Sequence, residues 1–353
     1  MSTSRSLLRA LRGAAVGAAL LLVTLALVVV AGNALTEDPD IDDVEYARAK
    51  LDLETPIESS LVETNGIRLH VVATGPTTGP PIFLLHGHGD LWWGWNRQIP
   101  ALVAAGFRVV APDLRGFNRS DKPLDISAYR RELVSDDIKG LIEALGYGSA
   151  YVVGHDSGAA IGWELLMRNP HRVRGFVSLG LGHPEAHRRA SGLPLYARVI
   201  RLGGMVPGAL RALLRAFNWY PIVAALRASG PGVFEESELD VYRASWARDD
   251  AITAASYWTL AKNPPTPMEP VRVPVLIVVV PDDTPIPPQP VRESTRFSTD
   301  ARLHEIAAVG HWVHRQASAE TNRLLVDFVR SIEGAAQQGA AADRQGRRSD
   351  GPR

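Results

Sequence analysis

Residues 150–162, with the sequence AYVVGHDSGAAIG, decide the fold of this chain. A short apolar run rich in valine leads into a turn, and a run of small and apolar residues typical of a helix follows it. Gly154 and Gly158 stand two residues before and two residues after Asp156. This frame is typical of a nucleophile elbow, a strand-turn-helix corner that holds one residue in strained backbone geometry. The segment therefore predicts that Asp156 is a nucleophile.

Two other interpretations of the turn concern Ser157 and a helix cap. Centring the frame on Ser157 would replace both flanking glycines by His155 and Ala159, so the serine does not fit the corner. Asp156 could instead cap the helix that follows, which is a common role for aspartate. The cap remains the alternative to the nucleophile.

On either side of the turn, strand-like and helix-like patterns alternate along the chain. Short runs that are mostly apolar suit strands buried on both faces of a mainly parallel sheet. The expected strands are residues 61–63, 67–73, 81–85, 107–111, 150–153, 173–179, 275–280 and 302–307. Apolar residues at helical spacing predict helices over residues 129–145 and 319–332. The alternation predicts an α/β protein with eight strands, mostly parallel and flanked by helices.

Residues 183–270 break this alternation with a helical pattern that contains many aromatic side chains. Helices inserted between two core strands predict a lid over the carboxyl edge of the sheet, where open α/β sheets bind ligands. The expected organisation is an N-terminal anchor or signal segment (1–34), a linker (35–57), the first part of the core (58–182), the lid (183–270), the second part of the core (271–332) and a disordered tail (333–353).

The N-terminal segment indicates a membrane. Arg5, Arg9 and Arg12 precede an uncharged run over residues 14–32, which is about long enough to cross a bilayer as a helix. Basic residues before the run and acidic residues from Glu37 onward predict a cytoplasmic N-terminus and a catalytic domain on the extracytoplasmic side. A cleaved signal peptide, ending at small residues near Ala34, is the alternative and would release a secreted protein.

Composition excludes several classes of function. The 353 residues carry no net charge at pH 7, which gives no argument for a nucleic-acid partner. The chain has no cysteine, so disulfides, thiolate catalysis and cysteine-ligated metal sites are excluded.

Several short motifs resemble the α/β-hydrolase fold family, specifically its epoxide hydrolase and haloalkane dehalogenase branch. They are His86-Gly87, Asp113-Leu114-Arg115-Gly116, Asp121-Lys122-Pro123 and Gly154-His155-Asp156. The resemblance covers about residues 60–332. It implies a hydrolase that needs no cofactor, with a small apolar organic molecule and water as its substrates.

The resemblance also implies a catalytic acid and base, in the chain order nucleophile, acid, histidine. His311 follows the last apolar strand, where the family places its base, and His314 is the nearest rival. The family's acid stands three residues after a glycine that this chain replaces by Val280, and the proline four residues beyond the acid corresponds to Pro287. This register predicts Asp283 as the acid, with Asp282 as the alternative.

The oxyanion formed at Asp156 needs backbone donors. By resemblance these are the amides of Ser157 and His88, the latter within His86-Gly87-His88-Gly89. The alternation of His86, His88 and Asp90 after a strand could also suggest metal ligands, but this signal is weak, and no metal is expected.

The substrate class depends on the lid. Epoxide hydrolases of this branch use two lid tyrosines as donors to the ring oxygen, and here Tyr257 or Trp258 matches the second and Tyr220 is the nearest candidate for the first. Trp92 is also expected to contact substrate. Ser157 stands where dehalogenases often carry a tryptophan, which argues against halide chemistry. The sequence therefore predicts an epoxide hydrolase, with a dehalogenase, an ester hydrolase or a non-catalytic surface protein as alternatives.

Overall fold

The computed structural model describes residues 21, 23–190, 195–230 and 232–349. Its centre is one eight-stranded sheet with the order β1-β2-β4-β3-β5-β6-β7-β8. The strands are β1 (Glu58–Thr64), β2 (Ile67–Thr74), β3 (Pro81–Leu85), β4 (Arg108–Pro112), β5 (Ala150–His155), β6 (Val173–Leu179), β7 (Val275–Val279) and β8 (Ala301–Glu305). β2 runs antiparallel to both of its neighbours, and the strands from β4 to β8 pair in parallel. The predicted mostly parallel α/β sheet is confirmed.

The central strands form where the sequence is continuously apolar, because they are covered on both faces. Every residue of β3, β4, β5 and β7 is buried. Alternate residues of β3 enter different cores: Ile82 and Leu84 join one hydrophobic cluster, and Phe83 and Leu85 join the other. This is the arrangement expected of a parallel sheet between two helical layers.

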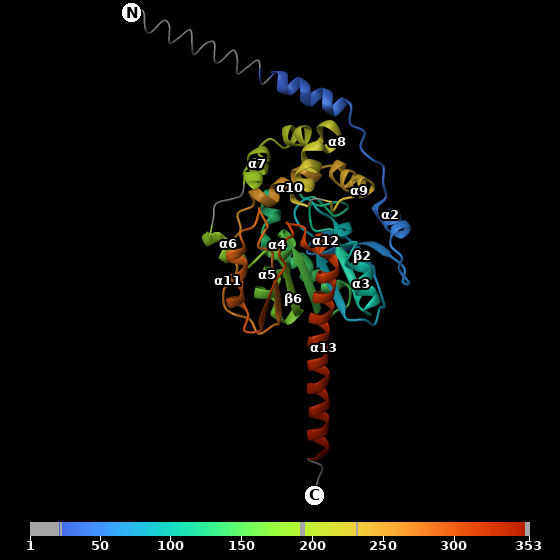
Figure 1. Cartoon of the computed structure of the whole chain (residues 1–353), viewed down its shortest axis with the longest axis vertical. Coiled ribbons are helices and arrows are strands. Elements are labelled where there is room, and N and C mark those ends of the chain that lie inside the picture. The colour runs from blue at the N-terminus through green and yellow to red at the C-terminus, as the bar shows by residue number, and fades with distance from the viewer. Residues whose placement is uncertain (1–20, 22, 191–194, 231, 350–353) are drawn as a thin grey trace, which may run out of the picture.

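Each face of the sheet has its own set of helices (Figure 1). One face packs against α3 (Ile99–Ala104) and the first half of α13 (Ser318–Ser349), and the other against α4 (Arg131–Ala144), α5 (Ser157–Arg168) and α11 (Pro288–Glu293). Shorter elements connect these layers: α2 (Asp43–Lys50), α12 (Val313–Gln316) and the 3₁₀ turns Trp92–Trp95, Ile126–Tyr129, Pro170–Arg172 and Ser294–Phe297.

Among the described residues between β6 and β7 there are five helices: α6 (Pro184–Ala190), α7 (Leu195–Gly203), α8 (Pro207–Ser229), α9 (Glu236–Ala247) and α10 (Ala251–Leu260). Figure 1 shows α7–α10 together over one end of the sheet, whereas α6 lies lower, beside α11. α8 is bent sharply, because Phe217, Asn218 and Trp219 all have positive φ angles between 55° and 62°. We call α7–α10 the lid.

The flanking segments contain more helix than the sequence predicted. Within the predicted linker 35–57, α2 forms and is capped by the Asp42 side chain on the amides of Val44 and Glu45, and Ala47 is fully buried. The tail is not disordered up to Ser349, because α13 continues to that residue. Its Ala, Gln, Arg and Glu residues favour helix even though they offer few apolar side chains for packing.

The predicted apolar run over residues 14–32 lies partly outside the described residues. From residue 23 to residue 34 the chain is helical. Within the described part of the chain, no helix is both long and apolar enough to cross a membrane.

Candidate active site

The turn between β5 and α5 forms the predicted corner. Asp156 has φ 50° and ψ −121°, a backbone conformation that costs free energy for a residue with a side chain. A Cβ on Gly158 would lie 2.1 Å from the carbonyl oxygen of Leu85, and one on Gly154 would lie 2.5 Å from the carbonyl oxygen of Gly158. The two glycines are therefore required because backbone occupies the space of their side chains. The Asp156 side chain makes no capping hydrogen bond to α5, so the helix-cap alternative has no support.

The structure brings Asp156, His311 and Asp283 together from the ends of three different strands. His311 Nδ1 lies 3.0 Å from Asp283 Oδ2, and His311 Nε2 lies 3.8 Å from Asp156 Oδ2. Asp283 is buried, and its other oxygen accepts the amide of Ile286. Asp282 instead accepts the amide of Ala308 at an exposed position. The geometry thus selects Asp283 over Asp282.

The charges of this cluster reinforce one another. Burial is the largest single influence on the pKa of Asp156 and would raise it, but the lowering influences, led by the charge of His311, together outweigh burial. His155 and the backbone of His88 and Ser157 lower this pKa further, to about 2. Burial would lower the pKa of His311, but its hydrogen bond to Asp283 and the charge of Asp156 raise it above its ordinary value. The charged form of each group thus favours the charged form of the other.

One oxygen of Asp156 accepts from the predicted amide of His88, and from the hydroxyl of Ser157 where the amide of Ser157 was predicted. The amide of His88 donates to Asp156 Oδ1 at 3.0 Å, and the Ser157 hydroxyl donates to the same oxygen at 2.9 Å. Oδ2 is left facing His311. The two carboxylate oxygens consequently differ, because one is held by hydrogen-bond donors and the other faces the candidate base.

Buried histidines around the site were not predicted. His155 Nε2 lies 2.8 Å from the carbonyl oxygen of His311, and burial lowers the pKa of His155 to about 3, so it is neutral. His187 of α6 accepts the amide of Gly182, and burial lowers its pKa to about 4 although the charge of Asp156 opposes this. The rival base, His314, is fully buried against Trp95 and His155, and its pKa is held well below the ordinary value. The only indication of these histidines in the sequence was that His155 directly precedes Asp156.

The segment after β3 is fixed to the lid. Tyr242 of α9 donates to Asp90 Oδ1 at 2.9 Å, and Trp246 Nε1 donates to the carbonyl oxygen of Gly89 at 2.9 Å. His86 Nε2 accepts the amide of Leu114 at 2.9 Å. The side chains of His86 and Asp90, two of the three considered as metal ligands after β3, therefore make structural hydrogen bonds.

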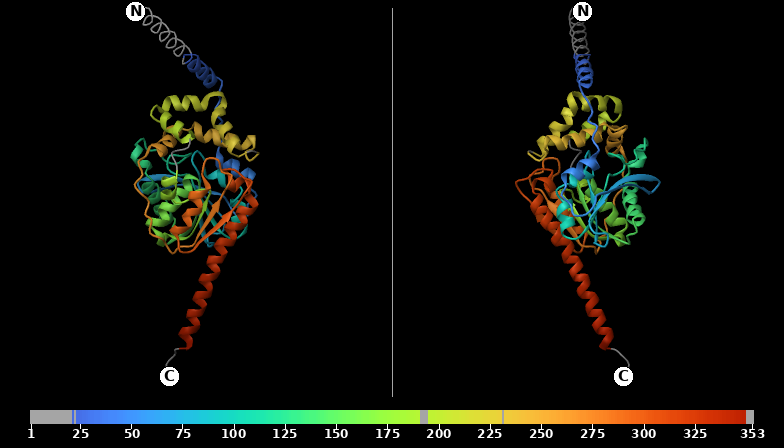
Figure 2. Two further views of the ribbon diagram at one scale, coloured as in Figure 1. Left: turned by 60° about the vertical axis from the view of Figure 1, so that its left-hand side comes forward. Right: turned by 90° about the vertical axis from the view of Figure 1, so that its right-hand side faces the viewer.

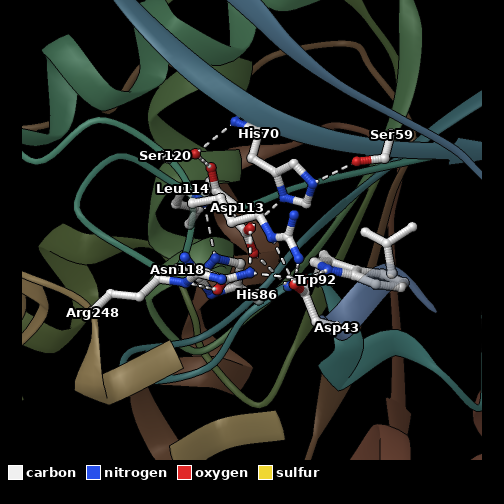
Figure 3. Close-up of polar contacts among 12 residues, drawn as sticks. Asp43, Ser59, His70, His86, Trp92, Asp113, Leu114, Asn118, Ser120 and Arg248 are labelled. Atoms are coloured by element: carbon white, nitrogen blue, oxygen red, sulfur yellow. Dashed lines mark hydrogen bonds and ion pairs between the residues drawn. The ribbon is translucent and has the colours of Figure 1, made fainter. Parts of the chain in front are cut away.

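A buried polar network lies beside this segment and joins it to the N-terminal part of the chain (Figure 3). Asp113 receives hydrogen bonds from His70, from the amide of Trp92 and from Asn118. Asp43 of α2 receives hydrogen bonds from Asn118 and from the indole of Trp92. Asp43, His70 and Asp113 bring metal-type ligand atoms within 4.8 Å of one another, but these atoms already hydrogen-bond to protein groups. The network is complete without an ion.

This network corrects the prediction for Trp92. Its side chain is fully buried, and its indole N–H is held by Asp43. Trp92 therefore packs α2 against the core and is not a substrate contact. Asp43 lies 49 positions earlier in the chain, a separation that sequence spacing does not reveal.

The lid aromatics are placed differently from one another. Tyr220 is 64% exposed on α8, so it faces solvent and the prediction that it is the first lid tyrosine is wrong. Trp258 donates its indole N–H to the carbonyl oxygen of Arg115, and its ring contacts Phe117. Tyr257 is half-buried on α10 and packs edge-on against Tyr129. Of the predicted pair on α10, Tyr257 is the one that carries a hydroxyl.

Comparison with known proteins agrees with this architecture. Residues 80–217 match the family model described as alpha/beta hydrolase fold. The chain is 31% identical to the AB hydrolase superfamily protein YfhM of Bacillus subtilis, over 78% of this chain and 99% of that protein. It is 28% identical to epoxide hydrolase B of Mycobacterium tuberculosis, over 76% of this chain and 97% of that protein. The crystal structure of epoxide hydrolase A from Mycobacterium thermoresistibile superposes with a TM-score of 0.63 at 27% identity, covering 78% of this chain and 98% of that chain. The chain belongs to the α/β-hydrolase family of enzymes, and the predicted resemblance to its epoxide hydrolase branch is confirmed.

The glycine frame generates the first prediction. Gly158→Ala should destabilise the protein by about 2 kcal/mol or more, because its methyl group would overlap the carbonyl oxygen of Leu85. Gly148→Ala is the matched control: nothing lies within 4 Å of the added carbon, so its stability should change by less than about 0.5 kcal/mol. Urea unfolding followed by circular dichroism measures both. Equal midpoints for the two variants would contradict the steric account of the corner.

Proposed function

We propose that this enzyme hydrolyses epoxides of small apolar organic molecules to diols through a covalent ester on Asp156. The observation that carries the proposal is the asymmetry of the carboxylate. Oδ1 is held by the amide of His88 and the hydroxyl of Ser157, while Oδ2 lies 3.8 Å from His311 Nε2. An ionised carboxylate on a strained corner attacks carbon without a base to activate it. The epoxide hydrolases among its relatives support the same substrate class.

In the first step, Asp156 Oδ2 attacks a ring carbon of the epoxide. The bond between that carbon and the ring oxygen breaks, and the ring oxygen takes a proton from a donor in the lid. The carboxylate becomes a neutral ester, with Oδ1 as its carbonyl oxygen. The pKa of about 2 keeps Asp156 ionised for this attack throughout the neutral range.

In the second step, water attacks the ester carbonyl carbon while His311 accepts its proton. Negative charge forms on Oδ1, where the His88 amide already donates. Collapse of this intermediate breaks the bond between the carbonyl carbon and Oδ2, and the diol leaves with Oδ2 and the proton from His311. Asp156 is left with the second proton of the water, which returns through solvent to the lid donor and restores the resting site. Asp283 holds the imidazole by its Nδ1 and stabilises its positive charge.

Alkylation itself prepares His311 to act as the base. The charge of Asp156 is one cause of the raised pKa of His311, and the ester has no such charge. The pKa of His311 should therefore fall once the ester forms, which favours the neutral imidazole that the second step needs. A single carboxylate thus serves as nucleophile in one step and tunes the base for the next.

Tyr257 is our proposed donor to the epoxide oxygen. It lies on α10, which is part of the lid, and it is the member of the predicted pair with a hydroxyl, since the indole of Trp258 is already held by Arg115. Trp258 packs on Phe117, whose ring also contacts His88. Because of these contacts, we expect the Trp258 ring to line the substrate site near the oxyanion donors.

The alternatives on the same fold have less support. A dehalogenase needs donors to the leaving halide, but the hydroxyl of Ser157 donates to Asp156 itself. A non-catalytic scaffold would have no need to keep His311 between Asp156 and Asp283, within ion-pair distance of both. Ester hydrolysis remains the second candidate, because the same oxyanion donors serve it.

We also propose that the N-terminal segment anchors the enzyme to a membrane, with the catalytic domain on the extracytoplasmic side. The uncharged run over residues 14–32, the arginines before it and the acidic residues after it support this orientation. A cleaved segment and a secreted enzyme are the alternative outcome.

The covalent step is tested by mass spectrometry of enzyme quenched during turnover of a reactive epoxide. His311→Gln should form the ester and hydrolyse it roughly 10²- to 10⁴-fold more slowly, so an adduct accumulates on the peptide that contains Asp156. Asp156→Asn should form none, and Ser157→Ala, which keeps its backbone amide, should still form it. Single turnover in ¹⁸O-water should label Asp156 and leave the first product unlabelled. A product labelled at once, with an unlabelled Asp156, would exclude the covalent route.

The pH dependence tests the role of Asp283. His311 must be neutral to accept a proton, so ester hydrolysis should slow as pH falls through the pKa that His311 has in the ester, which is lower than in the free enzyme because Asp156 no longer carries a charge. Ester formation should persist, because Asp156 stays ionised down to a pH of about 2. Asp283→Asn should move the acid limb of ester hydrolysis to lower pH and reduce its maximal rate. Asp282→Asn is the control and should leave the limb in place; an equal effect of both variants would refute the assignment.

The lid donor is tested with two tyrosine variants. Tyr257→Phe should lower kcat/KM for an epoxide by about 10²-fold, because the ring oxygen loses its proton source. Tyr220→Phe removes an exposed hydroxyl and should leave kcat/KM unchanged. A simple activated ester, whose opening needs no lid donor, separates loss of the donor from loss of the site. Normal epoxide turnover by Tyr257→Phe would exclude Tyr257.

The anchor is tested by fractionation of cells that express the full chain. Full-length protein should remain with the membranes after an alkaline wash. Release of a shortened form that begins near Leu35 would instead identify a cleaved signal segment, and release of the full-length protein would exclude both.

A further inference from the structure

Large apolar side chains are exposed on the outer surface of the lid. Six of them lie on α7, on α8 and on the turn between these helices, and each is between 42% and 73% exposed: Leu202, Met205, Val206, Leu213, Phe217 and Tyr220. We call this set the lid apolar surface. Large exposed apolar side chains gathered on neighbouring helices are typical of a site of contact with a protein or a membrane.

The N-terminal helix continues this surface. Six of its side chains, between 45% and 71% exposed, are also apolar: Leu21, Val23, Leu25, Leu27, Val28 and Val30. Its end packs on α8, since a Cβ on Gly32 would lie 2.9 Å from the ring of Phe217. Asn33 donates to the carbonyl oxygen of Ala212 at 2.7 Å, and Arg215 pairs with Asp38. Figures 1 and 2 show this helix leaving the molecule on the lid side, at the end opposite α13.

Arginine is the charged residue of the segment that carries the lid apolar surface, although Arg188, Arg215 and Arg227 pair with Glu185, Asp38 and Glu236. Residues 186–234 contain seven arginines and no aspartate, glutamate or lysine, and residues 1–36 contain three arginines and no acidic residue. Arg198 and Arg201 are exposed on α7, next to the exposed Leu202. Apolar side chains interspersed with arginine are typical of segments that lie in the interface of an anionic bilayer.

We propose that the lid apolar surface lies in the headgroup region of a bilayer that carries anionic lipids, the same bilayer that the N-terminal segment enters. The inference rests on the proposed anchor and adds a second contact to it. A second copy of the chain fits less well, because a symmetric pairing of this face would bring arginines against arginines. In this orientation the lid, which covers the sheet end bearing Asp156, faces the membrane. Apolar epoxides dissolved in the bilayer are then the substrates nearest the site.

The absence of cysteine allows a direct test in the full chain. Met205→Cys, at a position 73% exposed, is labelled with an environment-sensitive fluorophore and reconstituted in vesicles of phosphatidylcholine and phosphatidylglycerol. Leu303→Cys on β8, 41% exposed, is the matched control away from the lid. The Met205 label should shift its emission to shorter wavelength, be quenched by headgroup-linked nitroxide and be protected from iodide. The Leu303 label should be quenched by iodide alone.

Different results would overturn different proposals. Iodide quenching of the Met205 label equal to that of the Leu303 label, in protein that stays in the vesicles, would refute the lid contact and leave the anchor intact. Protection of the Met205 label in lipid-free detergent that rises with protein concentration would show that a second copy covers this face. The double variant Arg198→Gln, Arg201→Gln should reduce the protection severalfold in anionic vesicles and change it little in phosphatidylcholine vesicles. Equal protection of the double variant and the parent in both lipids would refute the role of anionic headgroups.

Discussion

The structure depends on the close packing of the β5–α5 corner against the end of β3. No side chain fits at Gly158, because the carbonyl oxygen of Leu85 would lie 2.1 Å from its Cβ. This contact brings the residues after β3 within hydrogen-bonding distance of Asp156, and the amide of His88 reaches Asp156 Oδ1 as a result. The nucleophile and its oxyanion donor come from different strands, so one steric constraint sets their geometry. The strain at Asp156 is held by this packing and by the sheet beneath it.

Burial affects the carboxyl groups of this region differently, according to their partners. Burial raises the pKa of Asp90, which receives hydrogen bonds from Tyr242 and the Leu91 amide but no ion pair. Asp156 is equally enclosed, yet its pKa falls, because His311 lies within ion-pair distance and backbone amides donate to it. The imidazoles and backbone donors around Asp156 therefore favour its ionised form, which is the form that attacks carbon.

The sequence alone predicted the parts of the molecule that local pattern determines. The buried strands follow from continuous apolar runs, and the corner follows from two glycines around Asp156. Asp283 could be assigned only with the family register, because Val280 stands in place of the usual glycine. The structure distinguishes the two aspartates, because Asp283 faces His311 whereas Asp282 accepts the amide of Ala308. Tyr220 was predicted at the substrate site but faces solvent, because helical spacing does not reveal the bend in α8, where three successive residues have positive φ angles. The tail is helical as far as Ser349 although it has few apolar residues, because its residues favour helix. Low apolar content therefore did not predict its structure.

The N-terminal part of the chain joins the lid to the catalytic core. Near its start, Thr36 accepts the amide of Asn218 and Asp38 accepts the indole of Trp219, so it holds two residues of the bend in α8. Further along, Asp43 joins the network of Asp113, whose carboxylate also accepts the amide of Trp92. A force or restraint applied at the N-terminal helix would therefore act on the lid and on the segment that carries the oxyanion donor. Anchoring through this segment would restrict the two parts of the site together, since the same short stretch of chain is bonded to both.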